Sequence, residues 1–450
     1  MIWKRLLIGI LAIGLAFLSP AARVSASGSE VPYQTYTYDK WGNATPSPNG
    51  YIPEKAIRGT GMGTSDFSDP QDLFYCEGRH EIYIVDTGNQ RILVTDEEFN
   101  LIRIFDELSW QGKAYQMQKP SGIYVTDEGT MYIADQGNAE LIICNQDGVI
   151  LKRYDKPESN LIDQTQEYKP NKVVVDENGK IFIQGVGVYQ GLIYLKPDGS
   201  FVKYFGPNKV EMTFKRIIMK MWKTILSDKA SKNMQSFNPI EYGNIFMAKN
   251  GFIYATAAAS ENNSKLIVQL NPIGVDVDRL KKPVWYENAT FADITVDDEG
   301  IITVVDGKTG RIYQCDKNGQ LMFAFGGIGE QLGLFKIPTS IIEVGDKLYV
   351  LDSEKRNITC FKLTSFGEKV RTAISLYNMG LYEESIKPWE EVTRQNANYL
   401  LAYTGMGKAY YQLGKYELAM KNYRLANDRS NYSTAYKEYS LQVMRSNFGL

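Results

Sequence analysis

The chain has 450 residues, of which 44% are hydrophobic and 23% are charged, and this length suggests two or three folded domains. Its formal net charge of -2 gives no overall indication of nucleic-acid binding. A single histidine, His80, largely excludes histidine-based catalytic triads and metal sites built from several histidines. The four cysteines are far apart and no pair has CxxC spacing, so we expect them at core positions rather than in a zinc site.

Residues 1–26 have the pattern of a secretory signal peptide. Lys4 and Arg5 precede an apolar run over residues 6–18, and a small-residue cleavage pattern follows it. The run is too short for a comfortable membrane span, although an uncleaved N-terminal anchor is the alternative. Either way, the sequence predicts an extracytoplasmic protein, secreted or attached to the outer face of the cytoplasmic membrane. We expect the N-terminal extension, residues 27–55, to pack on the folded body.

A short β unit repeats between residues 56 and 364. Residues 82–94 read as an apolar strand, a polar turn and a second apolar strand, and weaker copies follow at residues 131–143, 301–313 and 348–358. Successive units are roughly 46–50 residues apart, which is within the range of propeller blades. Each unit reads as four short antiparallel strands with Asp-Gly or Asn-Gly turns. Six units can be counted, beginning near residues 70, 120, 170, 239, 294 and 338.

The ends of the repeat predict how the ring of units closes. Unit six ends after its third strand, whereas residues 53–58 read as a fourth strand with no preceding three. We therefore expect residues 53–58 to complete unit six, because this pairing removes an open sheet edge. The predicted fold is mainly β, a six-bladed β-propeller over residues 56–364 that is followed by a small all-α tail.

The repeat unit resembles the NHL repeat, a Tyr-Val-Ala-Asp strand followed by a Gly-Asn-x-Arg turn. Unit one matches best, with Asp86, Gly88, Asn89 and Arg91 all in place, whereas unit two has Glu140 at the arginine position. Units three and four match only in outline. The resemblance implies an NHL-type six-bladed β-propeller.

One insertion, residues 206–236, breaks the period between units three and four. Apolar residues recur there at helical spacing beside basic residues, which predicts a basic amphipathic helix of about four turns. Its apolar face could pack on the propeller, or the helix could lie at an anionic membrane surface or in a groove of a membrane partner. The residues available for such a contact are Phe214, Lys215, Arg216, Ile218, Lys220, Met221, Trp222, Lys223 and Ile225.

After residue 364 the hydrophobic period changes to that of helices. Gly380 and Gly414 lie 34 residues apart, and several small and aromatic positions keep this offset. The spacing resembles tetratricopeptide (TPR) repeats, and residues 433–447 look like a capping helix. Two repeats and a cap would fold poorly alone, so we expect the tail, residues 365–450, to dock on the propeller or on a partner. The combination resembles bacterial exported NHL-repeat proteins with C-terminal TPR repeats that accompany ABC transporter systems.

The turn residues of the repeat are candidate binding residues. They could ring a polar funnel on one face of the propeller, which they would share with the interblade links and the insertion. The alternative is that Asp and Asn hold their own turns together by bonding nearby backbone N–H groups. The candidates are Asp86, Asn89, Arg91, Asp135, Asn138, Asp306, Arg311, Asp352 and Arg356.

These features predict a non-enzymatic extracytoplasmic binding or scaffold protein. We expect a protein partner, for example a component of a membrane transporter, and the membrane surface is an alternative contact for residues 208–230. No catalytic residue, metal or other cofactor is predicted, and no nucleic-acid partner is expected. The alternative is a calcium-dependent lactonase-like hydrolase with its metal ion on the propeller axis. A glycan-binding propeller is a third possibility.

Overall fold

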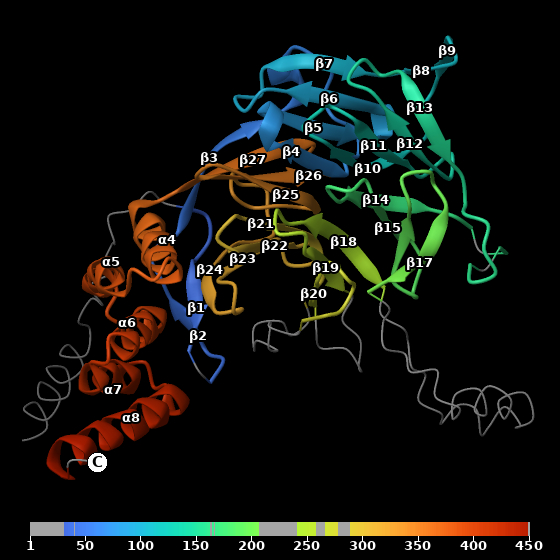
Figure 1. The fold of residues 1–450 in the computed structure, drawn as a ribbon. Helices are drawn as coiled ribbons and strands as arrows, with labels where there is room; N and C mark the ends of the chain where they lie inside the picture. Colours follow the sequence, from blue (N-terminus) through green and yellow to red (C-terminus); the bar gives the residue numbers. More distant parts are fainter. Residues whose placement is uncertain are drawn as a thin grey trace, which may run out of the picture. The chain divides into compact units, whose positions relative to one another are not determined.

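The computed structural model describes residues 31–448 except residues 40, 163, 166, 207–240, 258–265 and 278–288. The described residues belong to one compact unit, Val31–Leu450. Six β-sheets are arranged around an axis, and a group of helices follows them in the chain (Figure 1). The predicted signal peptide and the residues of the predicted insertion helix lie outside this description. Within the described residues, no helix is long and apolar enough to cross a membrane.

The six sheets are the six predicted blades. Their innermost strands contact one another in a closed ring that runs through β4, β10, β14, β18, β21 and β25 and returns to β4. Each of the first three blades has four antiparallel strands. These strands are β4 (Asp72–Cys76), β5 (Glu81–Asp86), β6 (Arg91–Thr95) and β7 (Leu101–Phe105); β10 (Pro120–Val125), β11 (Met131–Asp135), β12 (Glu140–Cys144) and β13 (Ile150–Tyr154); and β14 (Pro170–Val175), β15 (Ile181–Gly185), β16 (Leu192–Leu195) and β17 (Phe201–Phe205).

The other three blades vary this plan. Blade four has three strands among the described residues, and blade five is extended by an N-terminal hairpin, β1 (Tyr36–Tyr38) and β2 (Ala44–Pro46). The remaining elements are β18 (Tyr242–Met247), β19 (Ile253–Ala257) and β20 (Ile267–Leu270); β21 (Phe291–Val296), β22 (Ile302–Asp306), β23 (Arg311–Cys315) and β24 (Leu321–Gly326); β25 (Pro338–Val344), β26 (Lys347–Asp352), β27 (Asn357–Leu363) and β3 (Tyr51–Ile57); the hairpin β8 (Leu108–Trp110) and β9 (Lys113–Tyr115); and the 3-10 turns η1 (Gly59–Met62), η2 (Glu77–Arg79) and η3 (Thr87–Asn89).

Short polar turns join the third and fourth strands of a blade. In blade one, the Asp96 carboxylate accepts the backbone N–H groups of Glu98 at 3.0 Å and Asn100 at 2.8 Å. A side-chain oxygen that bonds residues two and four positions later imitates a backbone turn, which is why Asp and Asn recur here. The equivalent residues in other blades are Asn145, Asn271 and Asp316.

The predicted ring closure is confirmed. The N-terminal strand β3 pairs antiparallel with β27 of blade six, with Tyr51 opposite Leu363 and Ile57 opposite Ile358. The strand covers residues 51–57, so it begins two residues earlier than the predicted residues 53–58. The N-terminal extension also packs on the body as expected, because Tyr36 of β1 pairs with Ala324 of blade five.

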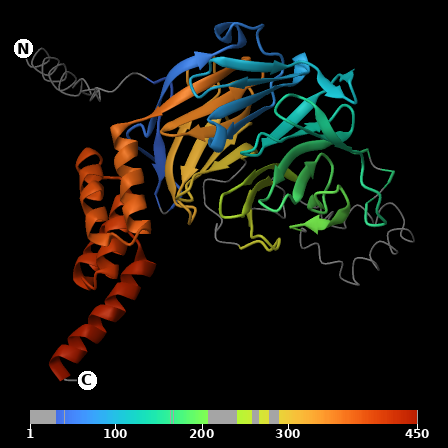
Figure 2. The same ribbon diagram turned by 45° about the horizontal axis from the view of Figure 1, so that its top comes forward.

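Five helices follow the propeller: α4 (Ser365–Asn378), α5 (Tyr382–Gln395), α6 (Leu400–Gln412), α7 (Tyr416–Leu425) and α8 (Arg429–Phe448). Each helix contacts the next one, and α4–α7 stack side by side (Figure 2). Small residues allow neighbouring helices to cross closely. A Cβ atom added at Gly407 would lie 2.6 Å from the ring of Tyr423, and one added at Gly405 would lie 2.4 Å from Trp389.

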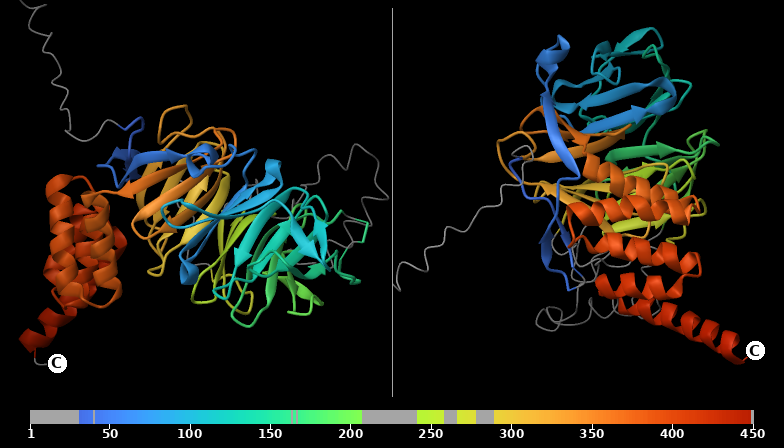
Figure 3. Two further views of the ribbon diagram at one scale, coloured as in Figure 1. Left: turned by 90° about the horizontal axis from the view of Figure 1, so that it is seen from above. Right: turned by 90° about the vertical axis from the view of Figure 1, so that its left-hand side faces the viewer.

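The helical tail docks on the propeller and shares its core (Figure 3). Phe366 of α4 lies edge-on to Phe323 of blade five and to Tyr399 before α6, with ring centroids 6.1 Å and 5.3 Å away. The buried Tyr399 hydroxyl donates to the Met322 carbonyl at 2.9 Å. Because aromatic residues bury the largest apolar areas, this contact fixes the first helices of the tail against blades five and six.

Candidate functional site

The predicted turn residues lie where the second strand of a blade meets the third. In blade one, Asp86 is fully buried and accepts hydrogen bonds from Ser68 N at 2.7 Å, Asn89 Nδ2 at 2.8 Å and Arg91 Nε at 2.8 Å. Arg91 also donates to the hydroxyl of Thr64 at 2.9 Å. Ser68 and Thr64 belong to the link that enters the blade, so the Asp86 network ties this link to the turn.

The same contact recurs in the other blades that keep the aspartate. Each carboxylate is fully buried and accepts a backbone N–H from the link that enters its own blade. This recurrence indicates that the aspartates hold incoming links in place, which is a structural role. The pairs are Asp135 with Gln118 at 2.8 Å, Asp306 with Thr290 at 3.0 Å and Asp352 with Lys336 at 2.6 Å.

The other candidate residues are divided among separate turns. Asn138 Nδ2 donates to Asp135 at 2.8 Å, as Asn89 does to its own aspartate. The Arg311 guanidinium lies 5.3 Å from the centre of the Tyr36 ring, and Arg356 occupies a left-handed turn position with φ of 54°. None of the candidate turn residues is among the residues that line the axial pocket described below.

A second set of equivalent residues converges on the propeller axis. Each lies on the innermost strand of its blade. Its neighbour on the second strand is the residue that comes just before the turn position. Unlike the turn aspartates, these residues change from blade to blade. They are Asp72, Gly122, Lys172, Asn244, Asp293 and Ser340.

These axial residues bond to one another across the ring. Lys172 Nζ forms an ion pair with Asp72 Oδ1, and Ser340 Oγ donates to Asp293 Oδ2 at 2.6 Å. Backbone N–H groups donate to both aspartates as well. Burial raises the pKa of Asp293 to about 6, and it also raises the pKa of Asp72 although Lys172 opposes the shift. The result is a buried polar floor.

A calcium ion does not fit this set of side chains. Ca²⁺ takes six to eight oxygen ligands, whereas the Lys172 ammonium already faces Asp72 at this level of the axis. Both aspartates are also bonded to N–H or O–H donors. In the part of the chain that the structure describes, no group of three or more His, Cys, Asp or Glu side chains could hold a metal ion. The floor residues therefore do not offer the calcium site that the hydrolase alternative requires.

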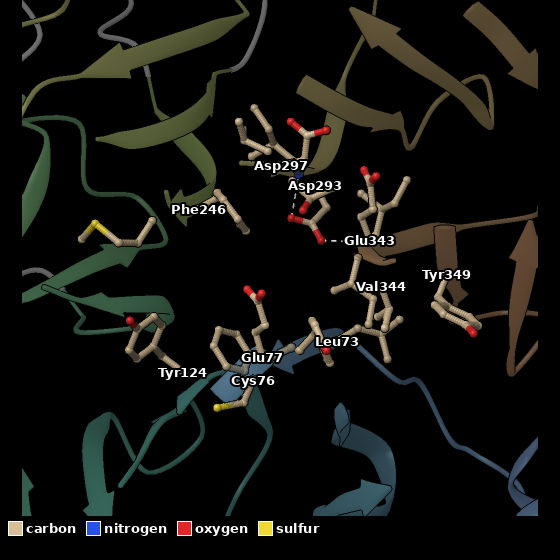
Figure 4. Close-up of a pocket in the computed structure, with 18 of the residues that line it drawn as sticks. Leu73, Cys76, Glu77, Tyr124, Phe246, Asp293, Asp297, Glu343, Val344 and Tyr349 are labelled. Atoms are coloured by element: carbon tan, nitrogen blue, oxygen red, sulfur yellow. Dashed lines mark hydrogen bonds between the residues drawn. The ribbon is translucent and has the colours of Figure 1, made fainter. Parts of the chain in front are cut away.

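Beyond this floor the axis opens into a pocket of about 800 Å³, which we call the axial pocket (Figure 4). Its volume is within the range of small-molecule sites. Phe74, Tyr124, Phe246 and Tyr349 contribute aromatic walls from four blades. Among its charged residues, carboxylates outnumber the cationic Lys172, Lys249, Lys347 and Arg371; the acids are Asp72, Glu77, Glu97, Glu98, Asp127, Asp293, Asp297, Asp298, Glu299, Glu343 and Asp346.

The axial pocket opens on the face opposite the turn aspartates. Innermost strands begin beside those turns, as the pairing of Pro120 with Asp135 and of Pro338 with Asp352 shows. The pocket mouth instead uses residues that follow the other ends of these strands, such as Glu77. The turn residues and the axial pocket therefore occupy different faces. The described ends of the insertion, at the close of β17 and the start of β18, lie on the turn face.

One wall group of the axial pocket comes from the helical tail. Arg371 of α4 donates to Glu343 Oε1 at 2.5 Å, to Asp297 Oδ2 at 2.6 Å and to the Tyr51 hydroxyl at 2.8 Å. Burial alone would lower the pKa of Arg371, but these three neighbours raise it, so the guanidinium stays charged. Burial raises the pKa of Glu343 to about 7, although Arg371 opposes the shift.

No protein-family model matches the chain, and no curated protein matches it. Among solved structures, a streptogramin B lyase is similar with 12% identity and a TM-score of 0.44, over 70% of this chain and 98% of that one. A gluconolactonase of Xanthomonas campestris has 13% identity and a TM-score of 0.42, over 71% and 99%. The extracellular domain of a putative one-component system of B. thetaiotaomicron has 11% identity and a TM-score of 0.36, over 74% and 40%. Similarity at this level carries no functional argument, so function must follow from the site.

The first prediction concerns the structural role of the turn aspartates. Asp86→Asn should lower the free energy of unfolding by about 3–5 kcal/mol, because it leaves the Arg91 charge buried without its partner. Urea denaturation measures this change. Asp147→Asn is the matched control: Asp147 is an exposed aspartate beside Arg103, and its loss should cost less than about 1 kcal/mol. An equally small effect at Asp86 would contradict the structural role.

The second prediction concerns pH. Because the pKa of Glu343 is raised in the folded protein, its contribution to stability is full below pH 4.5 and is lost as pH rises through about 7. Glu343 should account for about 3 kcal/mol of this pH-dependent change in the free energy of unfolding at most. Arg371, Asp297, Glu299 and Tyr51 are the charged or titratable groups that act on it.

Urea denaturation at pH 5 and pH 8 tests this expectation. The loss of stability between the two values should be smaller in Glu343→Gln than in the wild type. Glu417→Gln, on the exposed surface of α7, should keep the wild-type profile. Identical profiles for all three proteins would show that Glu343 does not hold a proton in the folded state.

Proposed function

We propose that the protein is a non-enzymatic binding protein that holds a positively charged ligand in the axial pocket. The observation that carries this proposal is the excess of carboxylates in a concave site of a chain whose formal net charge is only -2. A cleft lined by one sign of charge concentrates counter-ions of the other sign. The aromatic walls support the same class of ligand, because a cation is attracted to the face of an aromatic ring.

The chemistry of the axial residues favours binding over catalysis. Lys172 and Asp72 neutralise each other in the floor, and Asp293 is held by Ser340 and backbone N–H groups. Residues that serve a reaction would need a proton acceptor or nucleophile within reach of a substrate. The floor groups are instead buried and bonded to one another or to the backbone.

We also propose that the protein works outside the cytoplasm, secreted or attached to the outer face of the cytoplasmic membrane. The pattern of a signal peptide in residues 1–26 supports this location. The sequence predicts a protein partner at the insertion or at the TPR-like tail. It also predicts an accessory role in a transport complex, and both stay predictions. The NHL-repeat and TPR resemblances stay predictions as well.

The third prediction tests the ligand class. Isothermal titration calorimetry at low salt should detect binding of organic ammonium or guanidinium ions and no binding of carboxylates of similar size. Binding should weaken as salt is raised, because the attraction is electrostatic and partly screened. If no organic cation binds, or if anions bind equally well, the proposed function is wrong.

The fourth prediction concerns the insertion. If residues 208–230 contact an anionic membrane or a membrane partner, the full chain should co-sediment with membranes and a variant without these residues should not. The deletion should leave binding of cations in the axial pocket unchanged, because the ends of the insertion lie on the opposite face. Unchanged co-sedimentation of the deletion variant would exclude this role of the insertion.

A further inference from the structure

An ammonium group of the protein itself already lies at the mouth of the axial pocket. Lys249, in the turn after β18 of blade four, places Nζ 2.5 Å from Glu77 Oε2 and 2.7 Å from Asp298 Oδ2. These two acids belong to blades one and five, so the lysine joins three blades. All three side chains are about 60% exposed or more, so solvent and solutes reach them. The mouth acids thus already hold one alkylammonium group, that of Lys249.

A second acceptor in the same pocket has no partner. Glu343 uses Oε1 to bind Arg371, whereas Oε2 is buried and makes no hydrogen bond to the residues that the structure describes. The side chain is only 9% exposed. A buried carboxylate oxygen without a donor is unfavourable and calls for an explanation in a native structure. Glu343 lines the axial pocket, so a rotation of its buried carboxylate toward the pocket would let a ligand supply the missing donor.

Apolar and aromatic side chains line the axial pocket beside these acids. Figure 4 shows Tyr124, Phe246 and Tyr349 on three sides of the axial pocket, with Glu77 and Asp297 approaching from different sides. Rings and aliphatic groups of this kind pack favourably against methylene chains. A ligand that combines separate ammonium groups with a methylene linker matches this distribution of acids and apolar walls.

We propose that the axial pocket binds a linear aliphatic polyamine. One ammonium group replaces Lys249 Nζ between Glu77 and Asp298, and another donates to the free Oε2 of Glu343. This inference rests on the proposed function, because it names the cation that the pocket takes. The volume of about 800 Å³ accommodates such a small molecule.

The role of Lys249 distinguishes this arrangement from general attraction between a cation and an acidic surface. In the absence of ligand, Lys249 neutralises the two mouth acids, and the ligand must displace it. Removing Lys249 therefore frees a site for an ammonium group. Removing a lysine elsewhere on the surface changes the net charge equally without freeing this site.

The fifth prediction is tested by calorimetry with the full chain at low salt and pH 8, with spermidine, n-butylamine and Ca²⁺ as probes. Spermidine should bind at least tenfold more tightly than n-butylamine or Ca²⁺. Lys249→Ala should strengthen spermidine binding several-fold, whereas Lys362→Ala, an exposed lysine of β27, should change it less than twofold. Glu343→Gln should weaken spermidine binding at least tenfold, and Glu417→Gln should leave it unchanged. Circular dichroism confirms that each variant is folded.

The outcomes separate the inference from the proposed function. If n-butylamine binds as tightly as spermidine, or if Lys249→Ala and Lys362→Ala behave alike, the polyamine site is wrong while a cation-binding pocket stands. If Ca²⁺ competes equally, the pocket is a site for inorganic ions and the inference fails. If no probe binds, both proposals fail.

Discussion

The buried ion pair between Lys172 and Asp72 is the interaction on which the centre of the molecule depends. Six innermost strands bring six residues to one level of the axis, and charges there lose the solvation of water. Lys172 reaches across from blade three to meet Asp72 of blade one, and the remaining oxygens are satisfied by Ser340 and by backbone N–H groups. With this pair in place the axis has a floor, and the space beyond it is a pocket.

The two faces of the propeller have different properties because the two repeat positions have different constraints. The turn aspartate does the same task in each blade that keeps it, namely to hold the incoming link, so its identity is fixed. The axial position has no common task, and different blades place complementary groups there. Beyond it lie acids that the floor does not neutralise, which is why we propose a ligand site on that face.

Much of the fold could be predicted from the sequence because it depends on local patterns. Alternating apolar residues and Asp-Gly or Asn-Gly turns define the strands, and the counting of strands per unit predicts that β3 completes blade six, as the structure confirms. The axial pocket could not be predicted in this way. Its residues are equivalent only by position, and Arg371 meets Asp297 from 74 residues away. The residue two positions after the proline that starts units one, three and six is Asp72, Lys172 and Ser340, respectively. The sequence therefore shows this mixture, but not that these residues bond to one another.

The pairing of β3 with β27 has a consequence for the order of folding. It joins residues about three hundred positions apart, so closing the ring carries a chain-entropy term of about 5 kcal/mol. At the end of β27, the Thr364 N–H binds the Gly50 carbonyl at 2.9 Å, and α4 begins with the next residue. The two ends of the propeller chain and the start of the tail thus meet at one point, around Gly50 and Thr364. Arg371 lies within two turns of it, so the corner of the pocket around Glu343 is complete only when β3, blade six and α4 are all in place. A chain that is still incomplete lacks this corner.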